Sequence, residues 1–365
     1  RGFYQFNQLL ENGPDSPYVD WFIPLGPWPI NAYELSRPPG YSAWWGLHAL
    51  PKFNTATPAV REFLWSVAEH WIRFGADGWR LDVPNEIDDD TFWRTFRTRV
   101  KSANPDAYIV GEIWGDARRW LQGDMFDAVM NYLFTRAVIG FVAGARADPY
   151  LLQGVGYVPV PVLNAAEFGQ HVASILSLYP AEITQSQLNL LGSHDTARFL
   201  SIANQDASAA RLAHLLLLTF PGAPCIYYGD EIGMLGGKDP GSRGAFPWEH
   251  EDAWDHELLG YVTRLIEIRH QYPALRRGEF KTLYAQGGVF AFARQMAGQT
   301  LIVALNVDRE QRHTVPIAVT DSLGVPEGAS LHNVLASGDT RCRVAGGLIE
   351  DLTLGPREGT ILVVA

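Results

Sequence analysis

The sequence predicts an α/β fold followed by a smaller antiparallel β domain. Three observations support this: strand-like runs alternate with helical stretches over residues 58–273, helical periodicity is absent from residues 280–365, and residues 1–57 are crowded with proline and glycine. Strands that alternate with helices indicate a parallel sheet. The pattern alone leaves open whether this sheet is an open doubly wound sheet or part of a barrel.

Residues 1–57 are expected to form a packed region of loops. They carry eight prolines, together with many glycines and asparagines, and these residues interrupt regular structure. The aromatic side chains of the same stretch, among them Trp21, Phe22, Trp28, Trp44 and Trp45, argue against disorder.

Regular elements are expected from residue 58 onward. Pro58 directly after Thr57 suits the first turn of a helix, and Gly75 is placed to end that helix. A second helix is opened by Asp88 to Asp90 and ends before Pro105. The further helices are predicted at 116–121, 133–143, 164–178, 206–219 and 255–271. The strands are predicted at 79–83, 108–112, 126–131, 188–191 and 225–228.

The character of the chain changes near residue 273. Short runs rich in β-branched and aromatic residues follow at 289–292, 301–305 and 360–364, separated by Gly, Asp and Pro. We therefore expect three parts: a loop-rich region at 1–57, an α/β part at 58–273 and a β-sandwich domain at 274–365.

Composition excludes several classes of function. The chain has 29 Lys and Arg against 40 Asp and Glu, a net charge of −11, which argues against binding to nucleic acid or to an anionic membrane surface. Cys225 and Cys342 cannot form a disulfide framework, and without CxxC or HExxH a zinc site is not expected. The longest apolar stretch, 212–228, is interrupted by polar and breaker residues and is too short to span a membrane.

Acidic residues lie at the ends of three predicted strands. Within 79–83 the period of two places Arg80 and Asp82 on one face. Glu112 ends the next strand, and Asp195 follows the strand at 188–191. The carboxyl ends of parallel strands are where α/β proteins place their active sites. The alternatives are a structural ion pair for Arg80 with Asp82, and helix capping for Glu112 and Asp195.

Acids in this arrangement suit glycoside hydrolysis. That reaction needs a carboxylic acid to protonate the leaving oxygen and a carboxylate to attack the sugar or activate water. Arg80 would keep Asp82 ionised, because a neighbouring positive charge favours the carboxylate. The apolar neighbours of Glu112, which include Ile113 and Trp114, would favour its protonated form. A fourth acid, Glu231, follows the last predicted strand of the α/β part.

At these positions the sequence resembles the α-amylase family of glycoside hydrolases. Four motifs occur in the family's order: Asp77–Val83, Gly111–Trp114, Ser193–Asp195, and Gly222–Pro224 with Tyr227–Glu231. The resemblance implies that Asp82 is the nucleophile, Glu112 the acid/base and Asp195 the stabiliser of the transition state. It also implies that Arg80 and His194 contact the sugar at the reacting subsite.

Further motifs are similar to the neopullulanase, cyclomaltodextrinase and maltogenic amylase subgroup. Leu50-Pro51-Lys52-Phe53-Asn54 matches its Met-Pro-Lys-Leu-Asn signature. The implied substrate contacts are Asn85, Glu86 and Trp114 on the acceptor side and Asp239 and Arg243 on the donor side. Each has a structural alternative: a loop ion pair for Asp239 with Arg243, a solvated acid for Glu86 and a packing role for Trp114. Gly115 and Ala197 depart from the subgroup's usual His and Pro.

The resemblance implies a TIM (β/α)8-type barrel of which this chain holds strands 4–8. The family's third-strand motif and the first three strands have no counterpart before Arg1, so the chain is expected to be part of a larger enzyme. Five strands cannot close an eight-stranded barrel, and residues 1–365 alone are therefore expected to be poorly soluble and essentially inactive.

The sequence favours a retaining enzyme that cleaves α-1,4 bonds in maltooligosaccharides, cyclodextrins or pullulan, and it leaves cleavage of α-1,6 bonds open. The alternatives are an α-glucosidase or oligo-1,6-glucosidase, against which Lys52 argues, and a non-catalytic α-glucan-binding relative. A structural α/β protein is disfavoured by the matching acids. No cofactor is required, and calcium binding is left open. The sequence is compatible with a homodimer of the complete enzyme. A cytoplasmic location is favoured.

Overall fold

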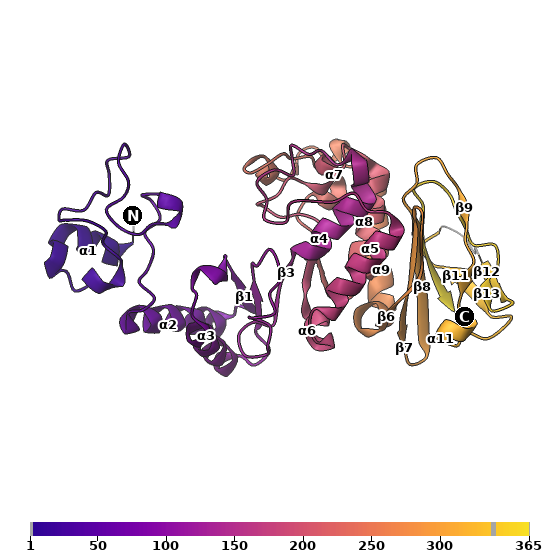
Figure 1. The fold of residues 1–365 in the computed structure, drawn as a ribbon, viewed down its shortest axis with the longest axis horizontal. Helices are drawn as coiled ribbons and strands as arrows, with labels where there is room; N and C mark the ends of the chain where they lie inside the picture. Colours follow the sequence, from indigo (N-terminus) through magenta and orange to yellow (C-terminus); the bar gives the residue numbers. More distant parts are fainter. Residues whose placement is uncertain (1–2, 337–340, 365) are drawn as a thin grey trace. The chain divides into compact units, whose positions relative to one another are not determined.

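The structure is a computed structural model that describes residues 3–336 and 341–364 (Figure 1). It contains two compact units. Unit 1 comprises Arg1–Ile109 with Asp124–Phe126, and unit 2 comprises Val110–Gly123 with Asp127–Ala365.

Unit 1 begins with a helix that the sequence analysis did not predict. Helix α1 (Tyr4–Asn12) precedes the first proline, Pro14, and buries Phe6 and Leu9, which are spaced three residues apart on one helical face. The many prolines at 14–57 led to a prediction of loops for the whole of 1–57, although residues 4–12 contain no proline. The rest of 13–57 is irregular, as predicted, and contains the short 3-10 turns η1 (Gly13–Asp15), η2 (Val19–Trp21) and η3 (Trp44–Gly46).

The regular part of unit 1 matches the expected boundaries closely. Its elements are α2 (Pro58–Phe74), β1 (Gly78–Leu81), η4 (Pro84–Glu86), α3 (Asp90–Ala103) and the start of β2 (Tyr108–Gly111). Gly75 ends α2 with its N–H bonded to Trp71 and Ile72 carbonyls at a φ of 122°, and Asp89 caps α3.

The buried side of α2 differs from the one that helical spacing predicts. That spacing favours an apolar face made of Val60, Leu64, Val67, Trp71 and Phe74. Val60, Ala68 and Ile72 are its buried residues, whereas Trp71 and Phe74 are exposed and pack against each other with ring centroids 5.6 Å apart. The helix carries two apolar stripes, and periodicity cannot decide which of them is covered. The apolar face of α3, which includes Phe92 and Val100, is buried as predicted.

Unit 2 contains parallel strands in the order β2-β3-β4-β5. The strands after β2 are β3 (Ala128–Asn131), β4 (Leu188–Leu190) and β5 (Ala223–Cys225). Val110 pairs with Ala128, and Met130 pairs with Leu188, all in parallel. The last strand was predicted to begin two residues and to end three residues too late, because Tyr227 and Tyr228 resemble strand residues but lie in the loop that follows β5.

The helices of unit 2 connect these strands and cover them (Figure 1). They are α4 (Tyr132–Val138), α5 (Ala165–Ser177), α6 (Ala181–Ser186), α7 (Phe199–Ile202), α8 (Ala207–Thr219), α9 (His256–Gln271) and α10 (Ala274–Arg277). A π-helical turn, η5 (Ile139–Ala143), continues α4. Short helical turns are η6 (Gly144–Arg146), η7 (Asp230–Ile232), η8 (Gly241–Arg243) and η9 (Glu251–Ala253).

The prediction of a helix at 116–121 is wrong. This stretch forms turns, in which the Asp116 carboxylate accepts from the Arg118 N–H at 2.9 Å and Trp120 N–H donates to the Ala117 carbonyl. Asp at this position offers the backbone a local hydrogen bond that competes with a helix. Helices α6 and α7 are too short for a periodic pattern and were not predicted.

The last part of unit 2 is an antiparallel β structure, as expected. Its strands are β6 (Glu279–Gln286), β7 (Val289–Met296), β8 (Gln299–Asn306), β9 (His313–Thr314), β10 (Ile317–Ala318), β11 (Ser330–Asn333), β12 (Arg341–Ala345), β13 (Leu348–Ile349), β14 (Thr353–Leu354) and β15 (Gly359–Val364). They form a sheet ordered β10-β13-β12-β11-β15-β8-β7-β6 and a pair β14-β9, with one short helix, α11 (Thr320–Leu323).

Strand β7 joins this β structure to the helices. Val289, Ala291 and Ala293 face the core of the β structure, while the alternate residue Phe290 packs edge-on against Phe168 of α5, with centroids 4.9 Å apart. Both faces of β7 are therefore covered, which explains why residues 289–293 of the strand are all apolar.

A buried histidine in α8 makes the stability of unit 2 depend on pH. Burial lowers the pKa of His214 below its ordinary value of 6.5, against a smaller opposing effect of the hydrogen bond between its Nδ1 and the Ala210 carbonyl. Below pH 6.5 the imidazole of His214 binds a proton in the unfolded chain but stays neutral in the folded protein until its lower pKa is reached. The contribution of His214 to stability is therefore fully present above pH 6.5, and it falls by up to about 1.4 kcal/mol per pH unit below that value.

We expect His214→Gln to remove this slope between pH 6.5 and 5, as measured by chemical unfolding. The matched change His270→Gln, at an exposed position of α9, should leave the slope intact. An unchanged slope in His214→Gln would contradict the assignment.

Among the described residues, no helix combines the length and the apolar character needed to cross a membrane.

Candidate active site

The end of β1 in unit 1 carries Arg80 and Asp82. The strand stops at Leu81, so Asp82 lies just beyond its carboxyl end, where Arg80 Nη1 contacts Asp82 Oδ1 at 2.5 Å. Gly78 allows this strand to lie close to β2, since a Cβ there would be 2.1 Å from the Tyr108 carbonyl oxygen. The Asp82 side chain is 79% exposed, which leaves it open to a ligand.

A sharp turn after Asp82 places the expected acceptor-side pair. Val83 adopts a φ of 30°, and the chain then enters η4, which contains Asn85 and Glu86. Glu86 is not simply a solvated acid, because its Oε2 lies 3.0 Å from Lys52 Nζ. Lys52 of the Leu50–Asn54 motif is thereby tied to the segment that follows the proposed nucleophile.

A cavity of about 700 Å³ opens beside these residues within unit 1. Asp82, Glu86, Lys52 and Trp44 contribute to its wall, and most of the remaining lining is apolar. A largely apolar cavity with a few charged groups at one side is typical of a binding site for a small organic ligand.

Glu112 in unit 2 follows the last residue of β2. It is 3% exposed and lies between buried Gly111 and Ile113, so its carboxyl group is shielded from water. No residue from 113 to 131 is helical, and all of them are described, so Glu112 does not cap a helix.

Trp114 stacks face to face on Tyr132, the first residue of α4. Their ring centroids are 3.8 Å apart and the rings are inclined by 6°, while the more distant Tyr157 ring lies 5.8 Å from Trp114. Trp114 remains partly exposed. The packing alternative for Trp114 is thus present in the structure, and a partly open indole still allows contact with a sugar.

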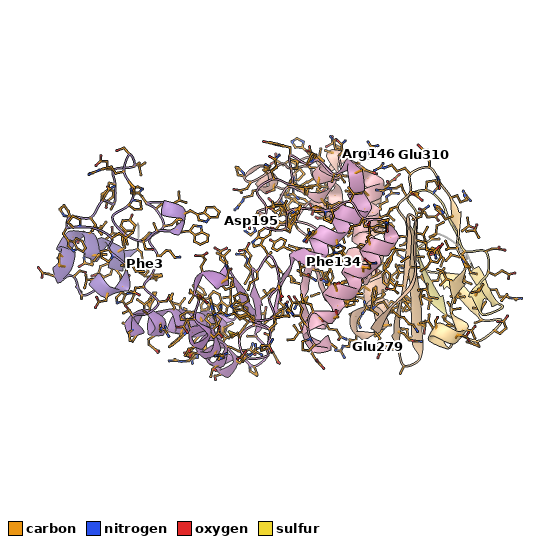
Figure 2. All side chains as sticks on the ribbon, viewed as in Figure 1. Phe3, Phe134, Arg146, Asp195, Glu279 and Glu310 are labelled. Atoms are coloured by element: carbon orange, nitrogen blue, oxygen red, sulfur yellow. The ribbon has the colours of Figure 1, made fainter. Side chains whose placement is uncertain are left out.

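Asp195, which is labelled in Figure 2, lies in the loop after β4. It takes part in a chain of charged groups. Its Oδ2 is 3.0 Å from His194 Nε2, and its Oδ1 is 3.2 Å from Arg243 Nη2. Arg243 Nε also contacts Asp239 Oδ1 at 2.6 Å. The loop ion pair considered for Asp239 and Arg243 therefore exists, and it extends to Asp195. Helix α7 has Arg198 at its N-cap, so Asp195 is not a cap.

The loop after β5 is held by a buried ion pair. Arg198 Nη1 donates to Asp230 Oδ1 at 2.8 Å and to the Tyr228 carbonyl at 2.7 Å, and its guanidinium lies over the rings of Tyr227 and Tyr228. Burial raises the pKa of Asp230 to about 7, although Arg198 opposes the shift. Sequence analysis missed Arg198, whose only signal was its closeness to the Ser193–Asp195 motif.

No cluster of three or more His, Cys, Asp or Glu side chains suited to a metal ion occurs among the residues that the structure describes.

Comparison with known proteins decides the family. The family described as the α-amylase catalytic domain matches residues 3–257, and the neopullulanase-like C-terminal domain matches residues 280–362. The chain belongs to the α-amylase family. The acids at the ends of β1 and β2 and after β4 thus lie within the part of the chain that matches the catalytic domain.

Several relatives carry this family's activities in their names. The chain is 42% identical over 311 residues to a cyclomaltodextrinase of Geobacillus thermopakistaniensis, covering 84% of this chain and 49% of the relative. It is 40% identical over 324 residues to neopullulanase 2 of Thermoactinomyces vulgaris, covering 88% and 52%. The chain spans about half the length of these curated relatives.

A solved structure is similar over nearly the whole chain. The debranching enzyme of Nostoc punctiforme in its native form is 48% identical, with a TM-score of 0.92, and the match covers 99% of this chain and 73% of that enzyme.

Proposed function

We propose that the natural protein containing this chain is a retaining glycoside hydrolase. It cleaves α-1,4 glucosidic bonds in maltooligosaccharides, cyclodextrins or pullulan, with α-1,6 bonds as a second target. The observation that carries the proposal is the position of Asp82, Glu112 and Asp195, each just past a parallel strand of a chain in the α-amylase family. The names of the cyclomaltodextrinase, neopullulanase and debranching relatives support this choice of substrates.

In the first step, Glu112 donates a proton to the glycosidic oxygen while the Asp82 carboxylate attacks the anomeric carbon. The bond to the leaving sugar breaks, and a covalent glycosyl ester forms on Asp82. In the second step, the Glu112 carboxylate takes a proton from water, which attacks the same carbon and releases Asp82. Two inversions give net retention. For this chemistry the carboxyl groups of Asp82 and Glu112 are expected to lie about 5–5.5 Å apart in the working enzyme.

The charged neighbours of these acids fit the proposed roles. The contact between Arg80 and Asp82 places a positive charge beside the proposed nucleophile. Asp195 stabilises the transition state, in which positive charge develops on the sugar ring, and His194 and Arg80 contact the same sugar. The Arg243 contact holds Asp195 in place and connects it with the donor-side residue Asp239. Asn85, Glu86 and Trp114 bind the acceptor sugars.

Two alternative functions are less well supported: a glucosidase of narrower specificity, and a relative that binds α-glucans without cleaving them. An α-glucosidase or oligo-1,6-glucosidase is disfavoured by Lys52, which contacts the proposed acceptor-side residue Glu86. A non-catalytic α-glucan-binding relative is disfavoured because all three acids are present.

The proposal is tested by following the hydrolysis of cyclodextrin and pullulan by the full-length natural protein with proton NMR. We expect the first product to carry the α-anomer at its new reducing end. A β-anomer at early times would establish inversion, and no hydrolysis of either substrate would contradict the proposal.

Two further proposals concern the whole protein. Residues 1–365 expressed alone are expected to be essentially inactive on both substrates beside an active full-length protein, and full activity of the shorter chain would refute this. The full-length protein is also proposed to form a homodimer, for which its mass in solution is the measurement.

A further inference from the structure

We infer that Tyr132 is a positioning residue that holds the loop of Glu112 and the loop of Asp195 in fixed relation. The inference rests on the proposed function and adds a residue to it. Tyr132 is 1% exposed, so it does not itself contact the substrate. It acts through two neighbours, Trp114 on its ring face and Ser193 at its hydroxyl group.

The ring of Tyr132 fixes the loop after β2. Trp114, two residues beyond Glu112, lies flat against it with centroids 3.8 Å apart. Gly156 confines the indole as well, because a Cβ at that position would be 2.7 Å from Trp114 ring atoms. With Tyr132 and Gly156 both in contact, the indole has little freedom to swing, and the short chain between Trp114 and Glu112 shares that restraint.

The hydroxyl group of Tyr132 fixes the loop after β4. Its oxygen is 3.0 Å from Ser193 Oγ, and Ser193 Oγ accepts from the Asp195 N–H at 3.2 Å. The N–H of Ser193 in turn donates to Thr196 Oγ1 at 2.9 Å. Since all these groups are buried or partly buried, each hydrogen bond is worth more than at the surface, and the backbone at Asp195 is held by a side chain from another element.

The position of Tyr132 is itself well determined. Asn131, the last residue of β3, caps α4 through the Phe134 N–H and also donates to Asn189 Oδ1 of β4 at 2.8 Å. Asn189 donates onward to the Pro221 carbonyl at 2.8 Å. Tyr132 is thus the first residue of a helix whose start is hydrogen-bonded to the neighbouring strand β4. Its fixed position restrains the loop after β2 through Trp114 and the loop after β4 through Ser193.

The chain offers a matched control for the hydroxyl group. Tyr157 belongs to the same group of stacked rings, but its hydroxyl oxygen is buried without a hydrogen-bond partner among the described residues. Burial accordingly raises the pKa of Tyr157. Removing this hydroxyl group breaks no hydrogen bond, whereas removing that of Tyr132 breaks the connection to Ser193.

The experiment compares Tyr132→Phe, Ser193→Ala, the double variant and Tyr157→Phe in the full-length natural protein, with maltotriose as substrate. We expect Tyr132→Phe and Ser193→Ala each to lower kcat about 3- to 10-fold, with KM and melting temperature nearly unchanged. The double variant should lose no more than the larger single loss, because both changes break one connection. Tyr157→Phe should keep wild-type kcat.

Three results would overturn the inference while the wild-type protein remains active. They are wild-type kcat in Tyr132→Phe, equal losses in Tyr132→Phe and Tyr157→Phe, and losses that multiply in the double variant. A loss of kcat that follows a lowered melting temperature would assign Tyr132 a purely structural role and also count against it. A wild-type protein that does not hydrolyse maltotriose or the other α-glucans would instead contradict the proposed function.

Discussion

Asp82→Asn is expected to lower the turnover of maltooligosaccharides by more than about 1,000-fold, because an amide cannot form the glycosyl ester. The Asp82 side chain is mostly exposed and contributes little to packing, so the variant should fold normally. The measurement is the initial rate of glucose and maltose release, combined with a melting curve.

Asp106→Asn is the matched control, since it makes the same chemical change at an exposed loop position of unit 1. It should keep the wild-type rate. Near-wild-type turnover in Asp82→Asn, in a protein with a normal melting curve, would refute the assignment of the nucleophile.

Glu112→Gln is expected to separate substrates by their leaving groups. A proton from the general acid is worth about 100- to 10,000-fold for a sugar alcohol, whereas an activated aryl leaving group departs without it. Hydrolysis of maltotriose should therefore fall by that range, while formation of the glycosyl ester from a nitrophenyl maltoside should change little. Glutamine preserves the shape of this buried side chain, which limits the structural cost.

Glu182→Gln, at an exposed position in α6, controls for the chemical change itself and should behave as wild type on both substrates. An equal loss on maltotriose and on the aryl glycoside in Glu112→Gln would remove Glu112 from the role of acid.

Much of the fold could be predicted because local signals agreed with the packing. Thr57-Pro58 and Gly75 bound α2, Asp89 caps α3, and short apolar runs mark β2 and β3. The incorrect predictions occurred where a few local residues determined the backbone structure against the composition of the wider segment. Asp116 turns the chain where a helix was expected, and α1 occupies a proline-free stretch inside a proline-rich region.

Single residues of the candidate site could be predicted from the sequence, but the contacts between them could not. Charges next to apolar strands drew attention to Arg80, Asp82, Glu112 and Asp195, because burial of charge is costly without a purpose. The interactions between distant segments carried no such signal. Tyr132 looks like any aromatic residue at a helix start, and its contacts with Trp114 and Ser193 span intervals of 18 and 61 residues.

The central claim is that Asp82 carries a covalent glycosyl intermediate. The most direct measurement is to react the full-length protein with a fluorinated α-glucosyl fluoride, whose electron-withdrawing substituent slows the release of the ester, and to map the labelled peptide by mass spectrometry. The account predicts one sugar per chain, attached to Asp82, and no label in Asp82→Asn. A label on another carboxylate, or turnover with an inverted product and no trapped ester, would contradict it.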